Sequence, residues 1–90
     1  MNPQKKKTLI ALRKARTLLS VVERMVQKDE YCIDIMQQTL ASIGLLKGVH
    51  AKLMEGHLDS CFINAMRARN SQQKERMIKE ILTVSKLANK

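Results

Sequence analysis

The most constraining feature of this sequence is a helical pattern that runs from about Glu30 to Arg67 without a proline. Its apolar residues recur three or four positions apart, the period of a helix with one buried face. They are Ile33, Met36, Leu40, Ile43, Leu46, Leu53, Met54, Leu58, Phe62 and Met66. A continuous helix of about 38 residues would be roughly 57 Å long, at about 1.5 Å per residue. That is too long for a compact monomer of 90 residues, so we expect this helix to pack against a partner.

Two shorter helices flank the long one. The first is predicted from about Lys5 to Gln27, and it ends at a polar cluster where Asp29 can cap the next helix. A break at Asn70 and Ser71 precedes the third. The apolar positions of these two helices are Leu9, Leu12, Leu18 or Leu19, Val22, Met25 and Val26, then Met77, Ile78, Ile81, Leu82, Val84 and Leu87.

Composition supports a wholly helical fold. The chain has one proline, three glycines and 2% aromatic residues, which argues against a β-sandwich or barrel. The sequence therefore predicts an all-α fold, with a three-helix protomer built around a long central helix. We expect a single domain over residues 1–90, with a basic N-terminal tail of about residues 1–7.

The net charge of +9 is spread unevenly. Residues 1–28 carry +7 and residues 62–90 carry +5, whereas residues 29–61 carry −3. Surplus lysine and arginine on the outer segments can neutralise phosphates and release counterions, which favours a polyanionic partner. Charge alone equally allows a solvated surface that only aids solubility.

The two cysteines are expected to be reduced. The basic start runs into a mixed segment without the features of a signal peptide, and no apolar run approaches the roughly 20 residues of a membrane span. We therefore expect a cytoplasmic protein that does not enter the membrane. A thiol pair in that compartment is more often metal-binding or redox-active than a structural disulfide.

Cys32, His57 and Cys61 are the candidate metal ligands. His57 and Cys61 are four residues apart, so they share one face of a helix and can hold the same ion. Cys32 precedes His57 by 25 positions, which is roughly 37 Å along a continuous helix. It cannot reach that ion from the same chain, but it can from a second one.

An antiparallel pair of the long helices would bring Cys32 of one chain to His57 and Cys61 of the other. The two-fold centre then falls between residues 45 and 46, and it is flanked by Gly44 and Gly48. Glycines four apart allow close approach of two backbones, at about 1 kcal/mol of lost helix propensity each. Ligand spacing and glycine placement thus indicate the same dimer.

Other sulfur and nitrogen side chains have simpler explanations. A lone cysteine or histidine in a helix is usually structural, and only the combination of all three favours a metal site. His50 lies about 10 Å from His57 along the helix, too far to share the ion, and Met36 and Met54 are typical core fillers. Two thiolates and one imidazole suit Cu(I) or Zn(II). Three-fold coordination favours Cu(I), because zinc would need a fourth donor and none is evident.

Several of these residues stand in a wider pattern. Residues 23–25 (ERM), residues 29–34 (DEYCID), Gln38 and residues 53–61 (LMEGHLDSC) resemble the copper-sensitive operon repressor family, whose relatives sense nickel and cobalt, formaldehyde or persulfide. The resemblance covers roughly residues 9–87. It implies three-helix protomers, antiparallel dimers with a four-helix-bundle core, and a dimer of dimers. It also implies a repressor that binds operator DNA when metal-free and is released by Cu(I).

The resemblance implies roles residue by residue. The family's copper ligands match Cys32, His57 and Cys61, and its second-shell tyrosine matches Tyr31. Its third-helix glutamate falls on Met77 in ungapped counting, and Glu80 replaces it only with a loop insertion. The DNA-contacting segment of the first helix differs from the family's but stays basic. The DNA-binding candidates are Arg13, Lys14, Arg16 and, on the central helix, Lys47.

The function that follows is a metal-responsive transcriptional repressor, with Cu(I) as effector and operator DNA as partner. One alternative is a thiol, persulfide or aldehyde sensor that uses Cys32 and Cys61. Another is a copper-binding protein without DNA binding. No paired carboxylates, phosphate-binding loop or nucleophile and base arrangement is evident, so we expect neither an enzyme nor a small organic substrate.

Overall fold

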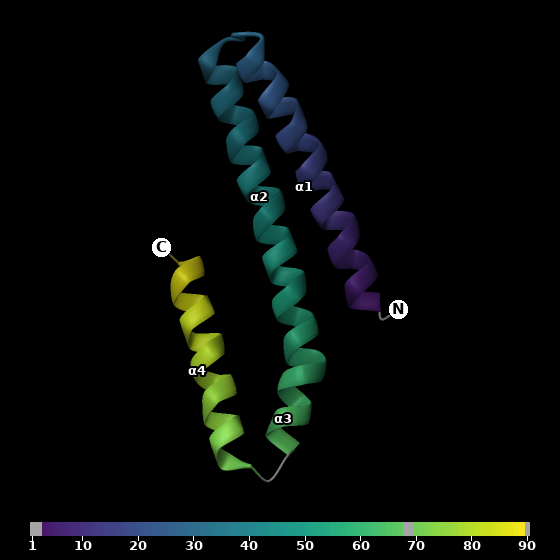
Figure 1. Cartoon of the computed structure of the whole chain (residues 1–90), viewed down its shortest axis with the longest axis vertical. Helices are drawn as coiled ribbons and strands as arrows, with labels where there is room; N and C mark the ends of the chain where they lie inside the picture. Colours follow the sequence, from purple (N-terminus) through teal and green to yellow (C-terminus); the bar gives the residue numbers. More distant parts are fainter. Residues whose placement is uncertain (1–2, 68–69, 90) are drawn as a thin grey trace. The chain divides into compact units, whose positions relative to one another are not determined.

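A computed structural model describes residues 3–67 and 70–89 of the chain. The described residues form α1 (Pro3–Gln27), α2 (Cys32–Gly56), the π-helix η1 (His57–Phe62), α3 (Ile63–Arg67) and α4 (Ser71–Ala88) (Figure 1). They contain no strand. Because α2, η1 and α3 follow one another without a break, helical structure is continuous along the chain from Cys32 to Arg67. The prediction of an all-α protomer with three helices is thus confirmed.

The first helix begins earlier than predicted. It starts at Pro3 rather than near Lys5, because proline suits the first helical position, where its fixed φ fits and its missing N–H is not needed. Residues 3–7, expected as a basic tail, therefore belong to α1. Residues 1 and 2 of that tail lie outside the described residues.

The turn between α1 and α2 corrects the role given to Asp29. Asp29 has a φ of 54°, in the left-handed region that Asp and Asn tolerate better than most side chains. Its N–H donates to the carbonyl of Val26 at 3.1 Å, and the N–H of Glu30 donates to that of Met25 at 3.0 Å. These two hydrogen bonds define a Schellman motif. Asp29 thus closes α1 instead of capping α2, which begins at Cys32 rather than Glu30.

The break before α4 is where the sequence placed it. Asn70 has an extended backbone, and its side-chain oxygen accepts the N–H of Gln73 at 3.2 Å. This is the standard N-cap interaction, which satisfies a backbone donor that the first turn of a helix leaves free. The third predicted helix and its start are confirmed.

The chain packs as two compact units, residues 1–55 and 56–90. In the first unit Ala15, Ser42 and Val49 are buried, at 1%, 2% and 8% exposure, and in the second Ala65 is buried at 5%. Many large apolar side chains of the single chain are exposed, among them Leu40 at 68% and Leu53 at 57%. Each unit therefore has a very small core of its own. The expectation of a single domain over residues 1–90 stays a prediction.

No helix in the described ranges, 3–67 and 70–89, has the length and hydropathy needed to cross a membrane.

Candidate metal and DNA-binding residues

Cys32 is the first residue of α2, directly after the turn that closes α1. Its thiol is free and exposed. The preceding residue, Tyr31, accepts the N–H of Ile35 through its carbonyl at 3.2 Å, which makes the first hydrogen bond of the helix. The start of α2 thus presents a thiol that a metal or a partner chain can reach.

His57 and Cys61 lie in the π-helical segment η1. A π-helix has i→i+5 hydrogen bonds and is slightly wider than an α-helix, so residues four apart still lie on one side of it. His57 is half-buried and Cys61 is exposed. Ser60 donates its hydroxyl to the carbonyl of Gly56 at 2.8 Å, and that hydroxyl lies 3.8 Å from the sulfur of Cys61. The predicted sharing of one face by His57 and Cys61 fits this geometry.

The π-helical form of this segment was not predicted from the sequence. Such segments are short and occur often at functional sites. The one local signal is Gly56, which immediately precedes His57 and lowers the preference for an α-helix by about 1 kcal/mol relative to alanine.

The three candidate ligands come from different units. Cys32 belongs to the unit of residues 1–55, and His57 and Cys61 to that of residues 56–90. Among the described residues, no three His, Cys, Asp or Glu side chains of one chain are grouped so that they could hold a metal ion. A single chain therefore brings together the pair in η1 but not the full set.

Gly44 and Gly48 lie on another side of α2 than Cys32, and their part in a dimer stays a prediction. Ser42 and Val49 are buried in the first unit. At about 100° per residue, Gly44 lies about 120° around the helix from Cys32, and Gly48 about 160°. A Cβ built on either glycine meets nothing within 4 Å. The two glycines are central in the sequence, but they do not lie on the face that carries Cys32.

A different set of residues shares the face of Cys32. Ile43 and His50 follow Cys32 by 11 and 18 residues, which is about three and five full turns. Met36 lies one turn after Cys32. Met36 is 51% exposed and Ile43 45% exposed, while His50 is half-buried. We call Cys32, Met36, Ile43 and His50 the ligand face of α2.

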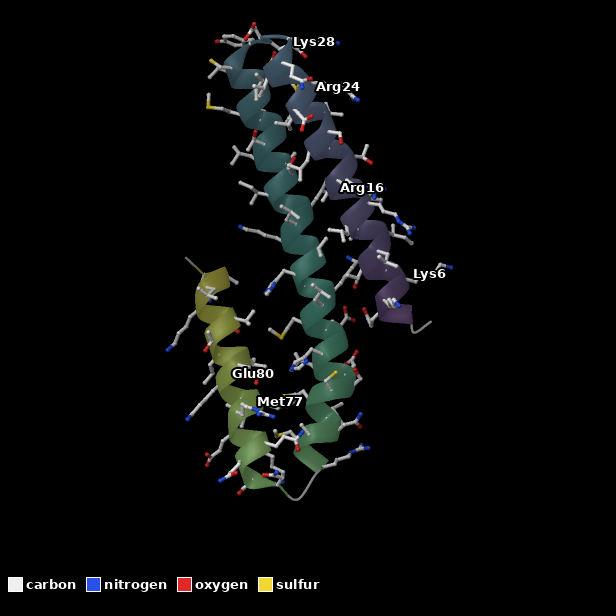
Figure 2. All side chains as sticks on the ribbon, in the orientation of Figure 1. Lys6, Arg16, Arg24, Lys28, Met77 and Glu80 are labelled. Atoms are coloured by element: carbon white, nitrogen blue, oxygen red, sulfur yellow. The ribbon has the colours of Figure 1, made fainter. Side chains whose placement is uncertain are left out.

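The two candidate outer-shell residues are both exposed. Tyr31 is 66% exposed. The carboxylate of Glu80 lies 3.8 Å from the guanidinium of Arg76, one turn earlier in α4, and both side chains are more than half exposed. Met77, which Figure 2 labels beside Glu80 on α4, is half-buried instead. In the single chain, Glu80 therefore pairs with a surface arginine.

The basic candidates fall into two groups. Arg13, Lys14 and Arg16 are exposed on α1. Lys47 is exposed on α2, five residues after the buried Ser42 and two before the buried Val49, so helical geometry turns it away from the α1-facing side. The structure brings three of the four together on one helix and leaves Lys47 on another face. Figure 2 also shows Lys6 and Arg24 on the side of α1 away from α2, which the sequence did not single out.

Over residues 4–86 the chain matches the profile of the metal-sensitive transcriptional repressors. The chain belongs to this family. The family's members are repressors and not enzymes, as the sequence predicted. The copper-sensing transcriptional repressor CsoR of Mycobacterium ulcerans is 32% identical over 66 residues, and that of Bacillus subtilis 34% identical over 65. These stretches cover 73% and 72% of this chain, but only 56% and 61% of the two relatives.

Two solved structures of the repressor family share the fold. The copper-sensing repressor CsoR with Cu(I) from Geobacillus thermodenitrificans is 26% identical, with a TM-score of 0.83 and coverage of 100% of this chain and 92% of that one. A variant of the formaldehyde-responsive regulator FrmR from Salmonella enterica serovar Typhimurium is 25% identical, with a TM-score of 0.76 and 96% coverage of each chain. The resemblance stated from the sequence is confirmed at the level of family and fold.

Proposed function

We propose that this chain is a copper-responsive transcriptional repressor, in which Cu(I) is held by Cys32 of one chain and by His57 and Cys61 of a second. The observation that carries the proposal is the donor set: two free thiols and one imidazole on a chain whose relatives are named copper-sensing repressors. Two sulfurs and one nitrogen suit the soft ion Cu(I), and Zn(II) would lack a fourth donor.

The ligand face of α2 supports an antiparallel pair of chains. In an antiparallel pair, the numbers of two residues that face each other always have the same sum. If Cys32 is opposite Cys61 of the second chain, that sum is 93. Ile43 then faces His50, and the two-fold centre lies between Leu46 and Lys47. Ile43 and Leu46 are 45% and 42% exposed in the single chain, so the pairing would bury apolar surface as well as complete the metal site. The dimer thus rests on the ligand face and not on the glycines.

Operator DNA is the partner that we propose for the basic residues. Arg13, Lys14 and Arg16 would contact phosphates from α1, and Lys47 would contribute from α2 near the two-fold centre. Pairing of such dimers would give the tetramer that the family resemblance implies. Because the partner is chromosomal DNA, we place the protein in the cytoplasm.

Copper would act by shifting the balance between DNA-binding and released forms. A coupling of about 1–3 kcal/mol would weaken DNA binding 5–150-fold. The two chains supply the metal-binding side chains on two separate helices, and the bound ion would restrict how those helices lie relative to each other. Tyr31 is the outer-shell candidate next to Cys32, and Glu80 would need to leave Arg76 to act as one.

The test is DNA binding with and without Cu(I), by fluorescence anisotropy, on the duplex upstream of the gene that encodes the chain. We expect the metal-free protein to bind and Cu(I) to release it. His57→Ala should bind DNA equally well but respond weakly to Cu(I). The control is Gln37→Ala, an exposed residue of α2 about 140° around the helix from Cys32, which should respond fully. Equal release of the wild type and His57→Ala would contradict the assignment of His57.

A thiol-reactive sensor is the second candidate, because both thiols are exposed and the fold resembles that of a formaldehyde-responsive regulator. It predicts that DNA is released by formaldehyde, or by a persulfide or peroxide, without any metal. Mass spectrometry of the released protein would then show an adduct or a chain-to-chain link at Cys32 or Cys61. Release by Cu(I) alone, with unmodified thiols, favours the copper repressor.

A further inference from the structure

The outward side of α1 carries a regular row of cations. Lys6 and Arg24 are 18 residues apart, which is about five full turns, so they point the same way. Arg13 lies between them, about two turns after Lys6 and three before Arg24. Ala15 is nine residues from both Lys6 and Arg24, about two and a half turns, so it points the opposite way. Since Ala15 is buried at 1% exposure, the row faces directly away from α2.

Figure 2 agrees with this geometry, because the side chains of Lys6 and Arg24 extend from α1 on the side away from α2. Both residues and Arg13 are exposed. None of the three forms an ion pair within the described part of the chain. We call Lys6, Arg13 and Arg24 the α1 ridge.

Apolar grooves flank the ridge on both sides. One is lined by Leu9, Leu12, Leu19 and Leu46, and the other by Ile10, Leu18, Val21 and Leu45, while Arg13 borders both. Glu23, the acidic residue next to Arg24, lines the first groove, about 100° around the helix from the ridge. The ridge itself therefore carries cations without an intervening carboxylate.

Two short polar residues, Thr17 and Ser20, lie between Arg13 and Arg24 on this side of α1, and their hydroxyls are bonded within the helix. Thr17 and Ser20 donate their hydroxyls to the carbonyls of Arg13 and Arg16, at 3.0 and 3.1 Å. These short side chains are already hydrogen-bonded within the helix. The long cationic side chains are what remains for an external anion.

We propose that the α1 ridge is a continuous phosphate-contacting surface, and that Lys6 and Arg24 bind the DNA backbone together with Arg13. This inference rests on the proposed function and specifies which side of α1 meets the duplex. Lys6 and Arg24 are about 27 Å apart along the helix, less than the roughly 34 Å of one turn of B-DNA. Duplex DNA carries one charge per about 1.7 Å of its axis, counted over both strands, so a row of cations of this length spans a densely charged part of the duplex.

Salt dependence measures such contacts directly. Each neutralised phosphate contributes about 0.9 to the slope of log affinity against log salt. The experiment uses the full-length metal-free protein and a duplex of about 30 base pairs and mixed sequence, titrated by anisotropy between about 50 and 200 mM NaCl. We expect Lys6→Gln and Arg24→Gln each to lower the slope by about 0.9 for every chain that contacts the duplex. Arg24→Lys should retain the slope.

Lys79→Gln is the control, because Lys79 is an exposed cation of α4, a helix to which we assign no DNA contact. It should leave the slope unchanged, and circular dichroism should give the same helix content for all variants. If Arg24→Gln gives the same slope of log affinity against log salt as the wild type, the proposed role of the α1 ridge is wrong. Binding to phosphatidylserine vesicles in place of duplex DNA would also overturn it.

The ridge and the proposed function fail in different ways. If Cu(I) does not release the wild type from its upstream duplex but Arg24→Gln lowers the salt slope, the copper response is wrong and the ridge is supported. If Cu(I) releases the wild type and Arg24→Gln changes nothing, the repressor is supported and the ridge is wrong.

Discussion

The carboxylate of Glu80 lies 3.8 Å from the guanidinium of Arg76, one turn earlier in α4, and both side chains are mostly exposed. An exposed pair of this spacing contributes about 0.3–0.5 kcal/mol. Glu80→Gln should therefore barely change the midpoint of urea unfolding. It should also leave release from DNA by Cu(I) unchanged if Glu80 stays with Arg76. A blunted copper response with unchanged stability would instead place Glu80 in the outer shell of the metal site.

Cys32 and Cys61 should complement each other between chains. Neither Cys32→Ala nor Cys61→Ala should bind Cu(I) with the full ligand set, because each alone lacks one thiol at every site. When the two variants are mixed and allowed to exchange, each mixed dimer regains one complete site. A Cu(I) titration in the presence of a competing chelator should detect these restored sites. Failure of the mixture to bind more tightly than either variant would contradict a site shared between two chains.

Gly44→Ala tests whether the side of α2 that carries Gly44 must pack closely against a second chain. A Cβ at Gly44 meets nothing within 4 Å in the single chain, so Gly44→Ala should stabilise the helix by about 0.5–1 kcal/mol. We expect a higher midpoint in thermal unfolding and unchanged Cu(I) binding. Ile43→Lys is the contrasting change on the ligand face, and it should shift the protein toward monomer in analytical ultracentrifugation. Dissociation of the protein caused by Gly44→Ala would instead indicate that Gly44 lies in the interface between chains.

Asp29 should tolerate glycine and reject β-branched residues, because its φ is 54°. Asp29→Gly relieves the left-handed strain and should maintain or raise stability. Asp29→Val should lower the free energy of unfolding by about 1–2 kcal/mol. Urea unfolding of both variants checks this. If the two lose the same stability, the side chain of Asp29 matters through an interaction other than the backbone conformation.

Asn70 should stabilise α4 through its cap. Asn70→Ala removes the acceptor for the N–H of Gln73 and should cost about 1 kcal/mol. Asn70→Asp keeps an acceptor at the same place and should cost far less. Thermal unfolding compares the two, and equal losses would mean that the hydrogen bond contributes nothing to stability.

The helices could be predicted because their apolar spacing is long and regular, and the start of α4 because Asn70 is a common capping residue. The role of Asp29 was predicted wrongly because the same residue type suits two positions. Asp favours both helix N-caps and left-handed closing positions, and only the hydrogen bonds to Met25 and Val26 separate the two roles.

The candidate site was predictable only in part. The four-residue spacing of His57 and Cys61 identifies a shared face whether the helix is α or π, so the sequence could not reveal η1. The part of Gly44 and Gly48 in a dimer stays a prediction, because counting along the chain locates a midpoint but does not give the rotation around the helix. Lys6 and Arg24 were overlooked because residues five turns apart are separated by many others in the sequence.

The small core around Ala15, Ser42 and Val49 has a consequence for how abundant the protein must be. A chain that buries so little alone gains much of its stability from association, so its melting temperature should rise with concentration. At low copy number in a cell, dilution would then favour unfolded chains and their degradation. The affinity between its chains would then set the lowest cellular concentration at which this protein stays folded. That limit holds independently of the concentration needed to occupy DNA.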